Sequence, residues 1–127
     1  MKKVNFSIAK RIKSFGFAFN GLRILFHEEH NSRIHFFASV LVIIAALLFK
    51  LNTYEWIAII FSIGFVITVE IINTAVENIA DFLTTEQNNH IKKIKDLVAA
   101  AVLVSALTAL TIGLIIFLPK ITALANL

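Results

Sequence analysis

Polar side chains recur at helical spacing between residues 70 and 81 of this otherwise apolar chain. The members of this polar stripe are Glu70, Asn73, Glu77 and Asp81. At about 100° per residue they fall within roughly 80° of one another on a single helix face. Carboxylate oxygens bind Mg²⁺ beside a nucleotide phosphate, and a carboxylate also serves as a general base. The polar stripe therefore indicates a site for phosphoryl transfer.

The depth of the polar stripe in a membrane follows from the uncharged run before it. Counting from Trp56 at about 1.5 Å per residue, Glu70 lies about 21 Å and Glu77 about 31 Å into a hydrocarbon layer about 30 Å thick. A carboxylate at the depth of Glu70 costs about 2.5 to 3.5 kcal/mol, so it should face protein, a metal or a wet cavity. The alternative is a set of structural carboxylates paired with Lys or Arg, which membrane depth disfavours.

Further charged groups flank the first and last apolar segments. Glu28 and Glu29 precede the first segment, and their carboxylates can join Glu77 in holding Mg²⁺. Lys95 and Asp96 precede the last segment, where Lys95 can offer a cation to phosphate oxygens. Each has a simpler alternative, since Asp96 can be a helix N-cap and Lys95 an anchor at the membrane surface.

Several other chemistries are excluded or disfavoured. The chain has no Cys, so it has no disulfide, thiolate nucleophile or cysteine-bound zinc. Its four Gly are too dispersed for a glycine-rich phosphate loop. The four His form no metal-binding or catalytic pattern with a carboxylate, so a histidine-metal site is disfavoured. These histidines are His27, His30, His35 and His90.

The overall composition is that of a membrane protein. The 127 residues are 58% hydrophobic with a mean hydropathy of +0.84, far more apolar than a soluble domain of this length needs. The net charge is +4. The basic residues flank apolar segments and are not interleaved with an exposed aromatic face, so we expect anionic lipid headgroups rather than nucleic acid as partner.

Apolar periodicity predicts four helices within a single domain, residues 1–127. Residues 5–27 have the pattern of an amphipathic helix lying on the membrane surface. Spans are predicted at about 34–50, 56–82 and 97–118. The predicted fold class is therefore an all-α integral membrane protein with three transmembrane helices and an N-terminal surface helix.

The distribution of Lys and Arg orients these spans. With the N-terminus inside, the basic residues up to Arg33, Lys2 and Lys3 included, and those of the 92–95 segment face the cytoplasm. Only Lys50 and Lys120 then lie outside. The N-terminus and the polar stripe are predicted to be cytoplasmic, on the side where ATP is found.

The local sequences around these residues carry a family resemblance. The stripe reads EIINTAVENIAD from residue 70, and IKDLVAAAV follows from residue 94. This pattern resembles the prokaryotic diacylglycerol kinase family, including its undecaprenol kinase branch. The resemblance runs without a gap from about Lys10 to Leu118, nearly the whole chain. Position 94 is Ile where the better-known members have Ala before the Lys-Asp pair.

The resemblance implies an ATP- and Mg²⁺-dependent kinase acting on the hydroxyl of a membrane lipid. It implies Glu70 as catalytic base, with Asn73 beside it, and Glu29 and Glu77 as Mg²⁺ ligands. Implied nucleotide contacts are Lys10, Arg11, Phe17, Glu29, Glu77, Asp81, Glu86, Lys95 and Asp96. Implied lipid contacts are Asn31, Glu70 and Ala99. Relatives tend to have Arg and Tyr where this chain has Lys10 and Phe17.

The family also implies a homotrimer in the bacterial inner membrane, with each site shared between adjacent protomers. Small residues recur every four positions along the third span, at Ala101, Ser105, Ala109 and Gly113. Such a ridge lets membrane helices approach closely. The alternative is an apolar helix that happens to be rich in Ala.

Two alternatives stay open. The acceptor is diacylglycerol or undecaprenol, and the segments EEHNSRIH and IIFLPK are more like the undecaprenol branch. The alternative function is a non-enzymatic cation-conducting or transport subunit whose acidic stripe lines a pathway. It is disfavoured because the third span and the outer half of the second offer no charged relay.

Overall fold

Four helices make up the fold in the computed structural model, which describes residues 5–126. They are α1 (Ile8–Glu28), α2 (His30–Leu48), α3 (Thr53–Leu83) and α4 (Asn89–Ala125). The described residues form no strand. Because α2, α3 and α4 are each long and apolar enough to cross a membrane, the predicted all-α fold with three spans and an N-terminal helix is confirmed. Lys2 and Lys3 lie outside the described residues.

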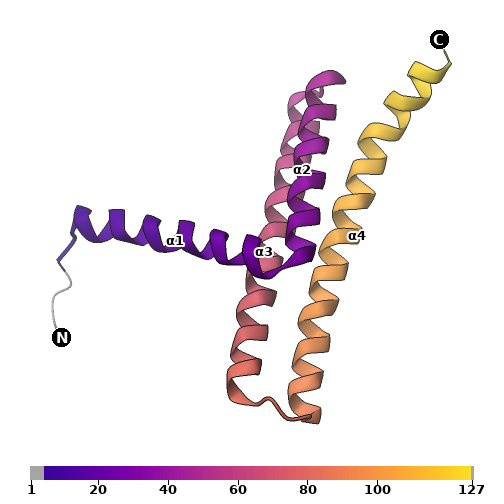
Figure 1. The fold of residues 1–127 in the computed structure, drawn as a ribbon. Coiled ribbons are helices and arrows are strands. Elements are labelled where there is room, and N and C mark those ends of the chain that lie inside the picture. The colour runs from indigo at the N-terminus through magenta and orange to yellow at the C-terminus, as the bar shows by residue number, and fades with distance from the viewer. Residues whose placement is uncertain (1–4, 127) are drawn as a thin grey trace.

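The helices form an upright bundle that one helix crosses. α2, α3 and α4 run along one another, and α1 runs across them at about the middle of α3 (Figure 1). Beyond the level of α1, α3 and α4 continue without α2 as a hairpin, closed by residues 84–88. An amphipathic helix that crosses spans usually lies at a membrane surface, so we expect this hairpin to extend from the membrane into water.

Side-chain caps explain where α3 and α4 begin. Asn52 Oδ1 accepts a hydrogen bond from the Glu55 backbone N–H, and the Glu55 carboxylate accepts one from the Asn52 N–H, both at 3.0 Å. This reciprocal capping box fixes the first turn of α3. Asn88 caps α4 by accepting from two backbone N–H groups of its first turn. Asp96 therefore lies inside α4, which excludes the alternative that it is the N-cap.

α4 extends beyond the predicted span of 97–118 at both ends. Its first turns are polar and lie in the hairpin, where a helix needs no apolar surface. At the other end it continues through Pro119, which removes one backbone donor without ending the helix. Lys120 Nζ lies 3.1 Å from Glu55 Oε1, which ties this end of α4 to the start of α3.

Arg33 holds the corner between α1 and α2. Its Nε donates to the carbonyl oxygen of Phe26 and its Nη2 to that of His27, each at 2.8 Å. These carbonyls lie in the last turn of α1, where helical donors are lacking. The guanidinium therefore caps α1 and fixes the path by which the chain passes through Glu29 into α2.

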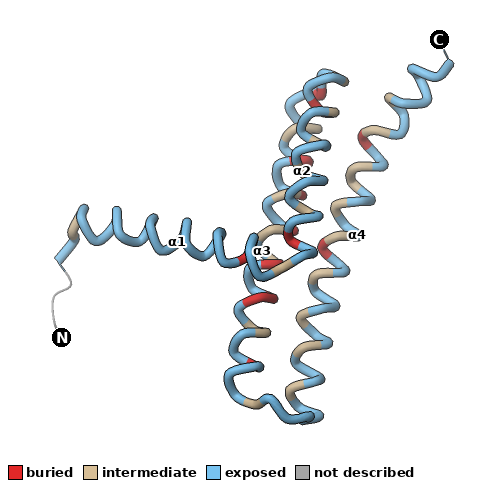
Figure 2. Tube along the Cα trace, viewed as in Figure 1, coloured by how far each residue is buried: buried red, intermediate tan, exposed pale blue. Residues whose placement is uncertain are grey.

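Most of the described residues are exposed (Figure 2), and many of the exposed residues are large and apolar. Few apolar residues are buried, and four of them, Ala46, Leu51, Ile59 and Ile116, form one core cluster. The largest fully buried side chains are polar, those of Glu70 and Ser105. Exposed apolar side chains on membrane helices suit lipid, whereas a fully buried carboxylate there points to function.

Candidate active site

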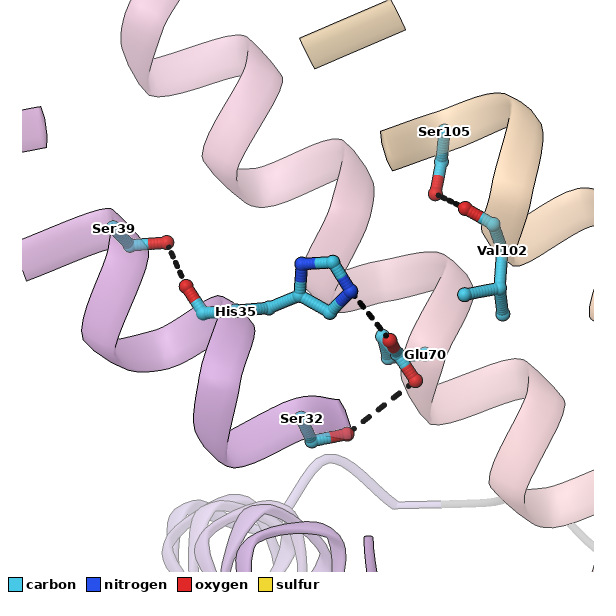
Figure 3. A network of polar contacts seen from close by, with 6 residues as sticks. All are labelled: Ser32, His35, Ser39, Glu70, Val102 and Ser105. Atoms are coloured by element: carbon cyan, nitrogen blue, oxygen red, sulfur yellow. Dashed lines mark hydrogen bonds and ion pairs between the residues drawn. The ribbon is translucent and has the colours of Figure 1, made fainter. Parts of the chain in front are cut away.

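Glu70 belongs to α3 and faces α2, with only 2% of its surface exposed. Ser32 Oγ donates to Glu70 Oε2 at 3.4 Å, and His35 Nε2 lies 3.2 Å from Oε1 (Figure 3). Ser32 and His35 are three residues apart on α2 and so share one face of it. Glu70 therefore faces a hydroxyl and an imidazole of α2 rather than the Lys or Arg of a structural ion pair.

An apolar pocket of about 240 Å³ surrounds the Glu70 carboxylate. α1 closes one side of it where that helix crosses the bundle. The lining residues are Leu22, Leu25, Phe26, Ser32, His35, Phe36, Ile67 and Glu70. A pocket with one carboxylate and mostly apolar walls, at the level of a surface helix, is suited to the hydroxyl end of a lipid.

Three buried polar atoms on α3 lack a hydrogen-bond partner among the described residues. They are Glu70 Oε1, Asn73 Oδ1 and Thr74 Oγ1. The contact of His35 with Glu70 Oε1 is close, but it is not aligned as a hydrogen bond. Since buried polar atoms are nearly always paired, such a cluster is typical of a site that binds a ligand or water.

A second group of carboxylates gathers where the corner after α1 meets α3. Burial and the neighbouring carboxylates of Glu77 and Glu70 raise the pKa of Glu29 above its usual value. Glu28 lies in the same corner, where its Oε2 accepts a hydrogen bond from Asn78 Nδ2 at 3.3 Å. The corner therefore brings Glu29 close to Glu77, although residue 29 is far from residue 77 in sequence.

The carboxylates of Glu29 and Glu77 fit Mg²⁺ in kind and number. Within residues 5–126 no three His, Asp or Glu side chains form a complete metal cage. Mg²⁺ is usually held by one or two carboxylates together with water and substrate phosphates, so two suffice. Their mutual repulsion, which contributes to the raised pKa of Glu29, is what a bound cation would relieve.

A third feature is a pocket of about 640 Å³ at the α3–α4 connection. Lys95 Nζ lies 2.5 Å from Asp81 Oδ1 across it, and Lys92 Nζ lies 2.6 Å from Asp96 Oδ2 on its α4 side. The residues that line this pocket are Asp81, Thr84, Thr85, Glu86, Gln87, Asn88, Asn89, Ile91, Lys92, Lys95 and Asp96. Four predicted nucleotide contacts, Asp81, Glu86, Lys95 and Asp96, thus share one water-facing pocket.

Comparison with known proteins decides the family. The family model described as prokaryotic diacylglycerol kinase matches residues 16–117. The chain belongs to this family. Among its curated members, the chain is 38% identical over 109 residues to the undecaprenol kinase of Bacillus subtilis, covering 86% of this chain and 89% of that protein.

Two diacylglycerol kinases are also similar to the chain. That of Synechocystis is 34% identical over 112 residues, covering 87% of this chain and 64% of that protein. That of Escherichia coli K12 is 30% identical over 98 residues, covering 77% of this chain and 80% of that protein. As a member of the prokaryotic diacylglycerol kinase family, the chain is a lipid kinase of the membrane.

Five predicted contacts of this lipid kinase are exposed residues that line neither the pocket around Glu70 nor the pocket at Asp81. Lys10, Arg11 and Phe17 are exposed on the part of α1 that points away from the bundle (Figure 1). The guanidinium of Arg11 lies over the ring of Phe6, which precedes α1 in the chain. The remaining two, Asn31 on α2 and Ala99 on α4, are exposed and line neither pocket.

Four polar residues at the site were not predicted from sequence: Ser32, His35, Thr74 and Lys92. A signal for the first two exists, because Ser32 and His35 are polar, three residues apart, and face one side of an apolar helix. Thr74 follows Glu70 by one helical turn. Lys92 precedes Asp96 by four residues, a spacing typical of an ion pair on a helix.

Proposed function

We propose that the protein transfers the γ-phosphoryl group of ATP to the hydroxyl of a membrane lipid in a Mg²⁺-dependent reaction. The observation that carries this proposal is the course of the polar stripe along one helix. Glu70 is fully buried in an apolar pocket, Glu77 is half-buried, and Asp81 has a largely exposed side chain beside water. A single helix can therefore serve an embedded alcohol at one end and dissolved nucleotide at the other.

The acceptor half of the reaction is assigned to Glu70 and Asn73. The lipid hydroxyl enters the 240 Å³ pocket and gives its proton to the Glu70 carboxylate as its oxygen attacks the γ-phosphorus. The new oxygen–phosphorus bond forms while the bond from the γ-phosphorus to the bridging oxygen breaks, so ADP leaves in line. Asn73, buried one turn along α3, is suited to orienting the acceptor.

The donor half is assigned to the water-facing carboxylates and Lys95. Glu29 and Glu77 would hold Mg²⁺, whose charge would offset that of the phosphates. Asp81, Glu86 and Asp96 line the pocket proposed for the nucleotide. Lys95, which pairs with Asp81 in the free protein, would exchange that carboxylate for phosphate oxygens.

We infer a homotrimer in the bacterial inner membrane, with the N-terminus and nucleotide pocket cytoplasmic. Because α1 extends well beyond its own bundle (Figure 1), we assign Lys10, Arg11 and Phe17 to the site of a neighbouring protomer. Asn31 and Ala99 are exposed in the single chain, and we assign them to lipid bound in a site shared with a neighbouring protomer. In support, the excess of Lys and Arg lies on the side of α1 and the hairpin.

The acceptor we favour is undecaprenol, with diacylglycerol as the alternative. The relative named undecaprenol kinase is 38% identical to this chain, against 34% and 30% for two named diacylglycerol kinase. The test is to incubate purified protein in detergent with γ-labelled ATP, Mg²⁺ and each lipid in turn. We expect label in undecaprenyl phosphate, and none without Mg²⁺. Ion flux through liposomes without any labelled lipid would instead support a transport subunit.

A further inference from the structure

His35 lies beside Glu70, the proposed base, but the proposed reaction does not use it. It lies on α2 with its Nε2 3.2 Å from Glu70 Oε1, and Ser32, one turn earlier on α2, donates to the other oxygen. Both oxygens of the buried carboxylate thus face side chains of the same helix (Figure 3). In the described chain no Lys or Arg lies within ion-pair distance of Glu70.

The imidazole of His35 also forms part of a second cavity. An apolar groove of about 410 Å³ lies among α2, α3 and α4, on the far side of the ring from α1. Its walls are mainly Ala, Val, Ile and Leu side chains, with Ser39, Ser62 and Gly113 among them. His35 is the one residue that lines both this groove and the pocket around Glu70. The ring therefore contacts both cavities.

A general base works only if its oxygen is held where the acceptor hydroxyl arrives. Glu70 Oε2 has one long hydrogen bond, of 3.4 Å, and Oε1 has no aligned donor. His35 is the side chain nearest to Oε1 that can supply one, because Nε2–H is a donor in the protonated ring and in one neutral tautomer.

We propose that His35 is a positioning residue for phosphoryl transfer, whose Nε2–H holds Glu70 Oε1 while Ser32 holds Oε2. Together they fix the plane of the carboxylate toward the lipid hydroxyl. This inference rests on the proposed role of Glu70 as base. It resembles the way that carboxylate and imidazole groups orient one another beside metals and nucleophiles.

The test compares two substitutions of His35 in the full chain. His35→Gln keeps an N–H donor at nearly the same reach, whereas His35→Leu keeps the bulk of the side chain and removes the donor. We expect His35→Leu to lower kcat about ten- to a hundredfold, the usual value of a hydrogen bond to a charged group, with KM for ATP and lipid nearly unchanged. His35→Gln should recover most of the wild-type kcat. Equal losses in both variants would overturn the proposal.

A double substitution separates positioning from general damage. Glu70→Asp retracts the carboxylate by one methylene, so His35→Leu should lower kcat much less in that background than in the wild type. His90→Leu is the matched control, since His90 is exposed at the start of α4 and lines neither pocket. Undiminished losses on the Glu70→Asp background would contradict the proposal.

A spectroscopic reading covers the case in which His35→Leu does not fold. In protein labelled with ¹⁵N-histidine, the Nε2 signal of His35 should shift in Glu70→Gln and stay in place in Glu55→Gln, at the far end of α3. An unshifted signal in both would overturn the proposal. The two hypotheses fail differently: an active Glu70→Gln refutes the base, whereas an inactive Glu70→Gln with a normal His35→Leu refutes only the positioning role.

Discussion

Lys95 and Asp81 face each other at the pocket between α3 and α4, with Nζ 2.5 Å from Oδ1, although they belong to different helices. The pair joins α4 to α3 at the end of the hairpin that lies beyond α1 (Figure 1). The pair places Lys95, the predicted cationic contact on α4, directly beside Asp81, the last carboxylate of the polar stripe.

Lys95→Met should weaken ATP use without affecting the lipid. Removing the ammonium takes away a charge-assisted bond to phosphate, so KM for ATP should rise about tenfold or more while KM for lipid stays constant. Steady-state kinetics with each substrate varied in turn measures this. Lys93→Met is the control. It removes the same charge from α4, but Lys93 does not line the pocket that contains Lys95. Equal effects of the two variants would contradict the assignment.

The raised pKa of Glu29 predicts a pH-dependent stability in the absence of Mg²⁺. Because burial and neighbouring carboxylates raise this pKa above 4.5, the folded protein binds more protons than the unfolded chain just above that value. The free energy of unfolding should therefore fall as pH rises through this range. Added Mg²⁺ should oppose the fall, and Glu29→Gln should remove it. Thermal unfolding of the apo-protein and of Glu29→Gln at several pH values, with and without Mg²⁺, checks both.

The cap that Arg33 places on α1 predicts a joint effect on stability and metal binding. Arg33→Gln leaves two carbonyls without their donor, which should lower the free energy of unfolding by about 1 to 3 kcal/mol. It should also raise the Mg²⁺ concentration needed for half-maximal rate, because the corner carries Glu29. Arg23→Gln, an exposed change on α1 itself, should do neither. Normal metal dependence in a destabilised Arg33→Gln would show that the corner does not position Glu29.

The capping box of α3 offers the reverse case, a change in stability without a change in chemistry. Asn52→Ala removes the acceptor for the Glu55 N–H and should cost about 1 kcal/mol, as loss of an N-cap usually does. Asn52 lies at the end of α3 remote from Glu70, so kcat and both KM values should match those of the wild type. A marked loss of kcat in folded Asn52→Ala would mean that the ends of α3 are coupled.

The sequence predicted those parts of the site that depend on one helix. Helical spacing places Glu70, Glu77 and Asp81 on one face of α3, which runs uninterrupted from Thr53 to Leu83. Apolar length predicted the number of spans. Both are properties of local sequence and a periodic backbone.

Contacts between helices could not be predicted in the same way. The meeting of His35 with Glu70 depends on how α2 packs on α3, and the nearness of Glu29 to Glu77 depends on the corner that Arg33 caps. The polar first turns of α4 were missed because an apolar search detects only the membrane part of a helix. Contacts assigned to Lys10 stay predictions, since α1 points away from its own bundle (Figure 1).

The most direct test of the account is turnover and nucleotide binding by purified Glu70→Gln. The substitution keeps the shape of the side chain and removes its capacity to accept the hydroxyl proton. We predict that lipid phosphorylation falls to the background rate while the affinity for ATP with Mg²⁺ stays within about twofold of wild type, since the nucleotide pocket lies two turns or more away along α3. Lipid phosphorylation by Glu70→Gln at the wild-type rate would contradict the account.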